Sequence, residues 1–221
     1  HDVRGERDTL GRRRRTRPIS TGKRVTAQKR DLLWFRKLRE HGPLPTSYLL
    51  AFAAGHGKSE KRAKERLTYL FNETETAHGG RYLERPPQQF RTLDSRYNQL
   101  VYDLAPAGTK ALRDAGDLPE AGMYPTGPWV HRFMVACVTA SIELATLARP
   151  DVAFIAGHRV VARAKTELRY PVAVLDPGSR EARIKDLIPD TIFGLEYRTP
   201  AGCRFRFFVV LRPAFFPTLG P

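Results

Sequence analysis

The stretch over residues 45–83 constrains the fold most, because two helical patterns of different character follow each other across a glycine turn. Residues 45–54 carry enough apolar side chains for one buried helix face. Gly55-His56-Gly57 interrupts this pattern, since glycine readily adopts the positive φ angle that ends a helix. A second helix is predicted over residues 59–72, where the apolar positions follow one stripe: Ala63, Leu67, Leu70 and Phe71.

The outer face of this second helix is cationic. Apart from Glu60 and Glu65, the polar face and the residue before the helix carry basic or aromatic side chains: Lys58, Lys61, Arg62, Lys64, Arg66 and Tyr69. Two helices joined by a short turn, the second with a cationic face, form the arrangement that presents a helix to a DNA major groove. An ordinary solvated surface is the simpler interpretation, so the neighbouring segments have to decide.

Those neighbours favour a winged helix-turn-helix over residues 26–116. An earlier helix is predicted over residues 27–41, with Thr26 as its cap. His78-Gly79-Gly80-Arg81 is predicted to form the tip of a hairpin, as in a wing, with Arg81 against DNA phosphate. Residues 100–104 are predicted to form a strand that pairs with this hairpin. Residues 105–112 are predicted to form a closing helix, which has a proline in its first turn and ends at Gly116.

Charge points to a polyanionic partner. The chain holds 38 Lys and Arg residues against 23 Asp and Glu residues, which gives a net charge of +15. Residues 1–25 combine dense charge with low hydrophobicity and are predicted to form a mobile basic arm. Within it, we expect four arginines to enter a minor groove or follow phosphates: Arg12, Arg13, Arg14 and Arg15. A solubilising tail is the alternative interpretation.

Other classes of protein are disfavoured by composition. No apolar run approaches the roughly 18 residues that span a membrane, and no signal-peptide pattern is present. Cys137 and Cys203 lie in apolar or strand-like runs without metal-ligand spacing, which predicts buried thiols in a reducing compartment. The six histidines are scattered and suggest no ligand set. We therefore expect a cytoplasmic protein with no membrane partner and no cofactor.

The second half of the chain has a different character. Residues 117–128 contain three prolines and two glycines, which is typical of a linker. Residues 129–148 are predicted to form a well-buried helix. Strands are predicted over residues 152–155, 160–164, 172–175, 191–197 and 203–211, with Gly157-His158 as the turn between the first two. A buried helix followed by a meander of strands predicts an α+β domain over residues 129–221.

Several motifs resemble the replication-relaxation family, whose members occur on plasmids and other mobile elements. TAQKRDLLWFRKLREHGPLPTSYLLAF and YDLAPAGTKALRDAG are similar to its winged-helix portion. A linker, the helix HRFMVACVTASIEL, then IPD before one strand and FRFFVV in the next follow in a similar order. The resemblance spans residues 26–210 and implies that the second domain looks like a restriction-endonuclease fold.

A nuclease of that fold needs two carboxylates. A Pro-Asp pair near the start of one strand and a Glu-x-Lys pair on the next hold Mg²⁺ and position the attacking water. Asp190 matches the first carboxylate, but Leu211-Arg212-Pro213 stands where the second is expected, and leucine cannot bind Mg²⁺. Glu196 and Asp186 lie at spacings that do not fit. The resemblance therefore implies a degenerate, inactive nuclease-like domain.

The last residues and the overall function leave alternatives open. Residues 213–221 are apolar and proline-rich, which fits either a natural terminus or a change of reading frame near Val210. We expect a sequence-specific double-stranded DNA-binding protein of a plasmid or other mobile element, acting in replication, transfer or transcriptional control. The C-terminal domain would support a homodimer or bind another protein. The alternatives are an Mg²⁺-dependent PD-(D/E)xK-type nuclease or nickase, and a structural protein that binds RNA or an acidic protein.

Overall fold

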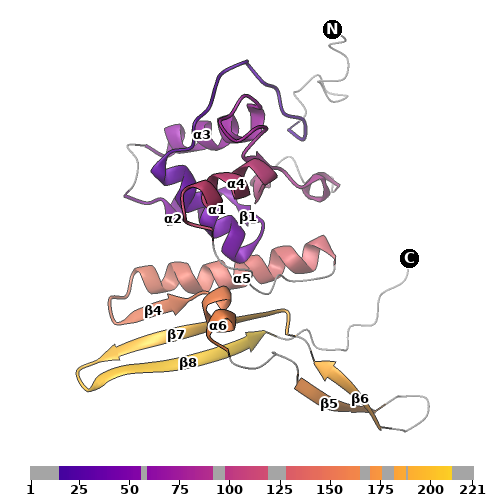
Figure 1. Cartoon of the computed structure of the whole chain (residues 1–221), viewed down its shortest axis with the longest axis vertical. Coiled ribbons are helices and arrows are strands. Elements are labelled where there is room, and N and C mark those ends of the chain that lie inside the picture. The colour runs from indigo at the N-terminus through magenta and orange to yellow at the C-terminus, as the bar shows by residue number, and fades with distance from the viewer. Residues whose placement is uncertain are drawn as a thin grey trace.

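The computed structural model describes residues 15–55, 59–91, 98–118, 128–164, 170–175, 182–187 and 189–210. Within these ranges lie six α-helices and three small antiparallel sheets, which confirms the expected mixture of helices and strands of an α+β protein. Figure 1 shows α5 lying between a helical first half and a sheet formed by β4, β7 and β8.

Three helices open the first half, close to the predicted positions. They are α1 (Lys29–His41), α2 (Thr46–Phe52) and α3 (Glu60–Asn72). The expectation that Thr26 caps α1 is wrong, because Gln28 holds that position. The backbone N–H of Gln28 donates to Asp31 Oδ2 at 2.8 Å, as in a capping box. Ser59 caps α3 by accepting the N–H of Arg62 at 3.3 Å.

A small three-stranded sheet completes the first half. Its strands are β1 (Leu44–Pro45), β2 (Leu83–Glu84) and β3 (Val101–Leu104), in the order β1-β3-β2. A 3₁₀ turn, η2 (Pro87–Phe90), lies in the connection between β2 and β3, and α4 (Pro106–Asp114) follows β3. β1 was not predicted, because two residues between prolines carry no periodic pattern.

The glycine turn at residues 78–81 is not the tip of a hairpin, so this prediction is wrong. It connects α3 to β2, whereas the antiparallel partner of β2 is β3, and the hairpin connection is residues 85–100. Gly79 and Gly80 adopt φ angles of 73° and 91°, which explains the two glycines. The Arg81 guanidinium lies 5.9 Å from the centroid of the Phe71 ring, beside α3 and not at a hairpin tip.

α5 (Trp129–Leu147) is buried on one side only, which corrects the expectation of a well-buried helix. Its buried residues are Val135, Ala136, Thr139 and Ala140. Ala136 and Ala140 belong to the same apolar cluster as Trp34 and Leu38 of α1. The opposite side exposes Val130, Met134 and Val138. The helix after the expected linker therefore shares the core of the first half.

By length and composition alone, α5 could cross a membrane, so the expectation that no segment meets this criterion is wrong. Its contacts, however, are those of a helix inside a folded unit. Tyr48 of α2 hydrogen-bonds Ser141 at 2.8 Å, and Lys37 of α1 pairs with Glu143 at 2.6 Å. These polar partners are supplied by neighbouring helices.

The second half is built on a sheet with the order β4-β7-β8. Its strands are β4 (Val152–Ile155), β7 (Thr191–Thr199) and β8 (Gly202–Val210), and the predicted hairpin between β7 and β8 is confirmed. Phe193 stacks between Phe154 and Phe208, with ring centroids 5.7 Å and 5.1 Å away. β5 (Tyr170–Leu175) and β6 (Ala182–Leu187) form a separate hairpin, of which β6 was not predicted.

The predicted strand at residues 160–164 is wrong, because residues 157–163 form a helix, α6 (Gly157–Arg163). Gly157 begins this helix and does not form a hairpin turn. A Cβ atom at Gly157 would lie 2.3 Å from the carbonyl oxygen of Ile192, so only glycine lets α6 start this close to β7. β7 takes the place beside β4 that the predicted strand would have filled.

The expectation that both thiols are buried fails for Cys203. Cys203 is exposed on β8, whereas Cys137 is partly buried in α5. Burial raises the pKa of the Cys137 thiol to about 11, so this thiol is protonated at neutral pH.

Candidate nucleic-acid interface

The orientation of α3 is fixed by its apolar stripe. Leu67, Leu70 and Phe71 are almost completely buried and Ala63 nearly so, as the periodicity predicted. The opposite face carries the exposed side chains of Lys61, Arg62, Lys64 and Glu65. A helix held so firmly on one side presents its other side as a rigid surface.

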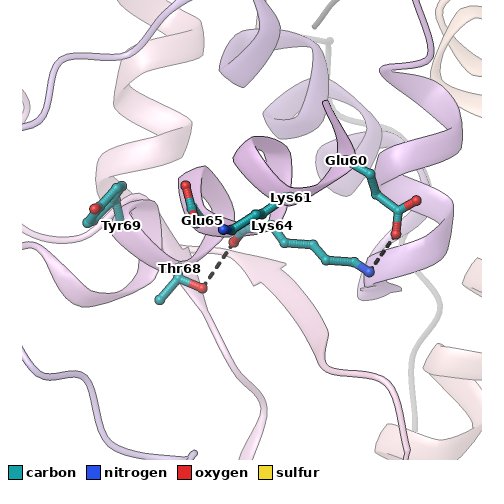
Figure 2. A pocket seen from close by; sticks show the side chains of 6 residues that line it. All are labelled: Glu60, Lys61, Lys64, Glu65, Thr68 and Tyr69. Atoms are coloured by element: carbon teal, nitrogen blue, oxygen red, sulfur yellow. Dashed lines mark hydrogen bonds and ion pairs between the residues drawn. The ribbon is translucent and has the colours of Figure 1, made fainter. Parts of the chain in front are cut away.

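Figure 2 shows a shallow depression of about 570 Å³ along this outer face. It is lined by Glu60, Lys61, Lys64, Glu65, Thr68 and Tyr69. Lys64 Nζ pairs with Glu60 Oε1 one turn earlier at 2.5 Å. Lys61 and Arg62 form no ion pair within the described residues, so their charges are available to a partner.

Arg66 does not join this surface, contrary to prediction. Its guanidinium turns inward and pairs with Asp31 of α1, with Nη2 at 2.6 Å from Oδ2 and Nε at 3.2 Å from Oδ1. It also donates to the carbonyl oxygen of Thr26 at 2.6 Å. Asp31 is 0% exposed, so Arg66 neutralises a buried carboxylate and holds α3 against α1.

Arg85 is a residue that the sequence did not indicate. Its guanidinium lies 4.0 Å from the centroid of the Phe71 ring and donates to Tyr102 Oη at 2.9 Å. It also donates to the carbonyl oxygen of Arg15 at 3.0 Å. These contacts tie the segment before α1 to β3. No periodic signal marks them, because they join residues far apart in the chain.

The described part of the basic arm is held against α3. This corrects the expectation of a mobile arm for residues 15–25: the backbone N–H of Val25 donates to the carbonyl oxygen of Glu75 at 2.9 Å, and Ile19 donates to Asn72 Oδ1 at 3.2 Å. Arg15 lines a second depression, of about 350 Å³, together with Lys64. Arg12, Arg13, Arg14 and Lys58 lie outside the described residues, as do residues 119–127 of the expected linker and residues 211–221.

Asp190 begins β7 beside a histidine. Its Oδ1 lies 2.8 Å from Nε2 of His131 at the start of α5, and its backbone N–H donates to the carbonyl oxygen of Val210 at 2.9 Å. Asp190 Oδ2 is buried without a hydrogen-bond partner in the described part of the chain. Within the described residues no second carboxylate joins this pair into a metal-ligand group, so the donors present do not fit an Mg²⁺ site.

Three other potential ligands do meet, although the scattered histidines suggested none. Glu40, His41 and Glu143 bring one donor atom each within 4.8 Å of one another. The ammonium group of Lys37 already lies between the carboxylates, 2.7 Å from Glu40 Oε2 and 2.6 Å from Glu143 Oε1. A lysine that neutralises both acids disfavours a metal ion. This cluster is better described as an ion-pair network that joins α1 to α5.

Burial alone would raise the pKa of Glu143. The hydrogen bond from His41 and the charge of Lys37 outweigh burial, so the pKa lies below its ordinary value of 4.5. His41 completes the network through Nδ1, which lies 2.9 Å from Thr139 Oγ1.

Comparisons with protein-family models, with curated proteins and with solved structures found no match.

Proposed function

We propose that this chain is a sequence-specific double-stranded DNA-binding protein whose α3 enters the major groove. The carrying observation is the pair Lys61 and Arg62, exposed on a helix whose opposite face is buried. A rigid helix with free cations is suited both to phosphate contacts and to reading guanine edges. The net charge of +15 supports association with a polyanion.

The order of elements supports a winged helix-turn-helix for the first half. Three helices, with β1 between the first two, precede β2 and β3, and the sheet order is β1-β3-β2. In this proposal the wing is the connection between β2 and β3, not the turn at residues 78–81. Arg81 then lies behind α3 and makes no wing contact.

The biological setting rests on the resemblance to the replication-relaxation family. It favours a cytoplasmic protein of a plasmid or other mobile element, acting in replication, transfer or transcriptional control. The second half, a degenerate nuclease-like domain in this proposal, would bind a second copy or another protein. No cofactor is needed for this role.

DNA binding by the variant Lys61→Ala/Arg62→Ala tests the proposal. Wild type is expected to select particular genomic fragments at both of two salt concentrations, and the variant to lose that selection. Lys110→Ala/Arg113→Ala on α4 removes the same charge from another exposed surface and is the matched control. If all three proteins bind every fragment alike and release together as salt rises, binding comes from charge alone. That result would favour an RNA- or protein-binding structural role.

The alternative, an Mg²⁺-dependent nuclease or nickase, rests on Asp190, whose Oδ2 has no partner within the described residues. Another chain would have to complete such a site. Cleavage of supercoiled plasmid that needs a divalent cation and disappears in Asp190→Asn would favour this enzyme. Intact plasmid with wild type and variant alike would exclude it.

A further inference from the structure

The segment before α1 is fastened to the C-terminal end of α3 by one carboxylate. Glu73, the C-cap residue of α3, is 0% exposed. Its oxygens accept from the Ser20 hydroxyl at 2.7 Å and from the Thr21 hydroxyl at 2.8 Å. The backbone N–H of Thr21 donates to both oxygens at 3.1 Å. We call this set of contacts the Glu73 clamp.

The position of Glu73 makes the clamp demanding. A carboxylate at the C-terminus of a helix faces the negative end of the helix dipole, and burial removes its water. Burial alone would raise the pKa of Glu73, but the hydrogen bonds from Ser20 and Thr21 lower it below 4.5. The buried charge therefore depends on residues 20 and 21 staying in place.

Contacts on both sides of the clamp extend its effect along the segment. Toward α1, Lys23 Nζ lies 5.0 Å from the centroid of the Tyr69 ring. Toward the N-terminus, the carbonyl oxygen of Arg15 accepts from Arg85. Figure 1 shows the segment arching over α3. The direction in which the arginine run approaches α3 is therefore set by the fold.

The segment ends at a cationic depression. Arg15 and Lys64 line the same space of about 350 Å³, together with the hydroxyl-bearing residues Thr46, Ser47 and Thr68. Burial, and then the neighbouring charge of Arg85, lower the pKa of Arg15. This shift indicates an excess of positive potential, which a phosphate group would relieve.

We propose that Glu73 is a positioning residue for nucleic-acid binding: its clamp holds Arg15 beside Lys64, so that the two cations bind one DNA backbone phosphate next to α3. The inference rests on the proposed function and deepens it. The arm and α3 then form one continuous surface, rather than a helix with an independent tether.

Glu73→Gln tests the clamp, because its two possible effects on DNA affinity have opposite signs. Removing a negative charge should strengthen binding if charge alone matters. If the clamp positions Arg15, binding should weaken by about tenfold, and the slope of log K against log salt should fall by about 0.9, the value for one lost phosphate contact. Glu75→Gln, an exposed neighbour with the same change of charge, is the matched control and should keep the wild-type slope.

Arg15→Ala should give the same loss of slope, and the double variant Glu73→Gln/Arg15→Ala should lose no more than either single variant. Should Glu73→Gln fail to fold, Ser20→Ala/Thr21→Val removes both hydroxyl donors from the other side of the clamp and should show the same loss.

The inference is overturned if Glu73→Gln binds DNA as Glu75→Gln does while Lys61→Ala/Arg62→Ala is impaired. In that case the proposed function survives without the clamp. If wild type binds no duplex fragment, both proposals fall together.

Discussion

At the scale of single residues, the pair of Asp31 and Arg66 illustrates what a buried charge requires. Asp31 has no exposure and also accepts the backbone N–H of Gln28, so Arg66 is its only charged partner within the described residues. Breaking such a pair from one side leaves an uncompensated charge.

Asp31→Ala is therefore expected to lower the free energy of unfolding by about 3–5 kcal/mol, because the Arg66 guanidinium stays partly buried without its partner. Urea denaturation measures this change. Glu65→Ala on the exposed face of the same α3 is the control, with an expected change within about 0.5 kcal/mol. A similar small effect for both variants would mean that the pair contributes little.

Glu143 makes the stability of the chain depend on pH. Its folded-state pKa lies below the ordinary 4.5, so its contribution is present above 4.5 and is lost as the pH falls through the folded-state value. Compared with Glu143→Gln, wild type should be more stable at neutral pH, and this difference should shrink in acid. Denaturant unfolding of both proteins over that pH range is the measurement. A difference that stays constant with pH would contradict the assignment.

Residue types predicted the faces of α3 well, but not the partners of its side chains. The 3.6-residue period shows which residues of α3 are buried, and the structure agrees. It does not show that Arg66 turns toward Asp31, 35 positions earlier, while Lys61 and Arg62 stay exposed. Glu73 also follows from no local rule, since a carboxylate at a helix C-terminus is unfavourable until the arm supplies its donors.

At the scale of elements, α4 depends on close approach to the small sheet. A Cβ atom at Gly108 would lie 2.4 Å from Leu104 Cδ1 and 2.6 Å from the carbonyl oxygen of Tyr82. This glycine lets the helix rest directly on the strands.

Gly108→Ala is expected to lower the free energy of unfolding by about 1–3 kcal/mol through overpacking. Helix propensity alone would predict the opposite sign, a gain of up to about 1 kcal/mol. Thermal unfolding distinguishes the two, with Lys110→Ala at an exposed position of the same helix as the control. A gain in stability would show that Leu104 and β2 can move away.

The misplaced elements share one physical cause. Val160 and Val161 favour a strand, but β7 already pairs with β4, and α6 forms against it instead. The glycine turn at residues 78–81 has the composition of a hairpin tip, yet the strand that pairs with β2 comes some twenty residues later. Composition indicated turns and strands, whereas pairing was decided by contacts distant in sequence.

At the scale of the whole molecule, β8 is an edge strand with an apolar face. Phe205, Phe207 and Val209 project from one side of it and are 54%, 57% and 41% exposed. Two copies paired antiparallel about Phe207 would place Phe205 of one copy opposite Val209 of the other. Arg206 would then face Phe208 of the second copy, so that like charges are kept apart.

Sedimentation equilibrium without DNA is expected to give a dimer for wild type and a monomer for Phe207→Asp, because the substitution places two carboxylates at the two-fold axis. Leu147→Asp, at an exposed apolar position on α5, is the control and should remain dimeric. A monomeric wild type would assign the β8 edge to another partner.

The position of α5 bears on how this chain can be divided. Ala136 and Ala140 complete the core around Trp34, and Glu143 holds the Lys37 ammonium group. A fragment that stopped before α5 would open that core to water and leave Lys37 with only Glu40. The first half is therefore not a portable module: grafted alone onto another protein it would carry an unfinished interior, and any partner that displaced α5 would loosen the platform beneath α3.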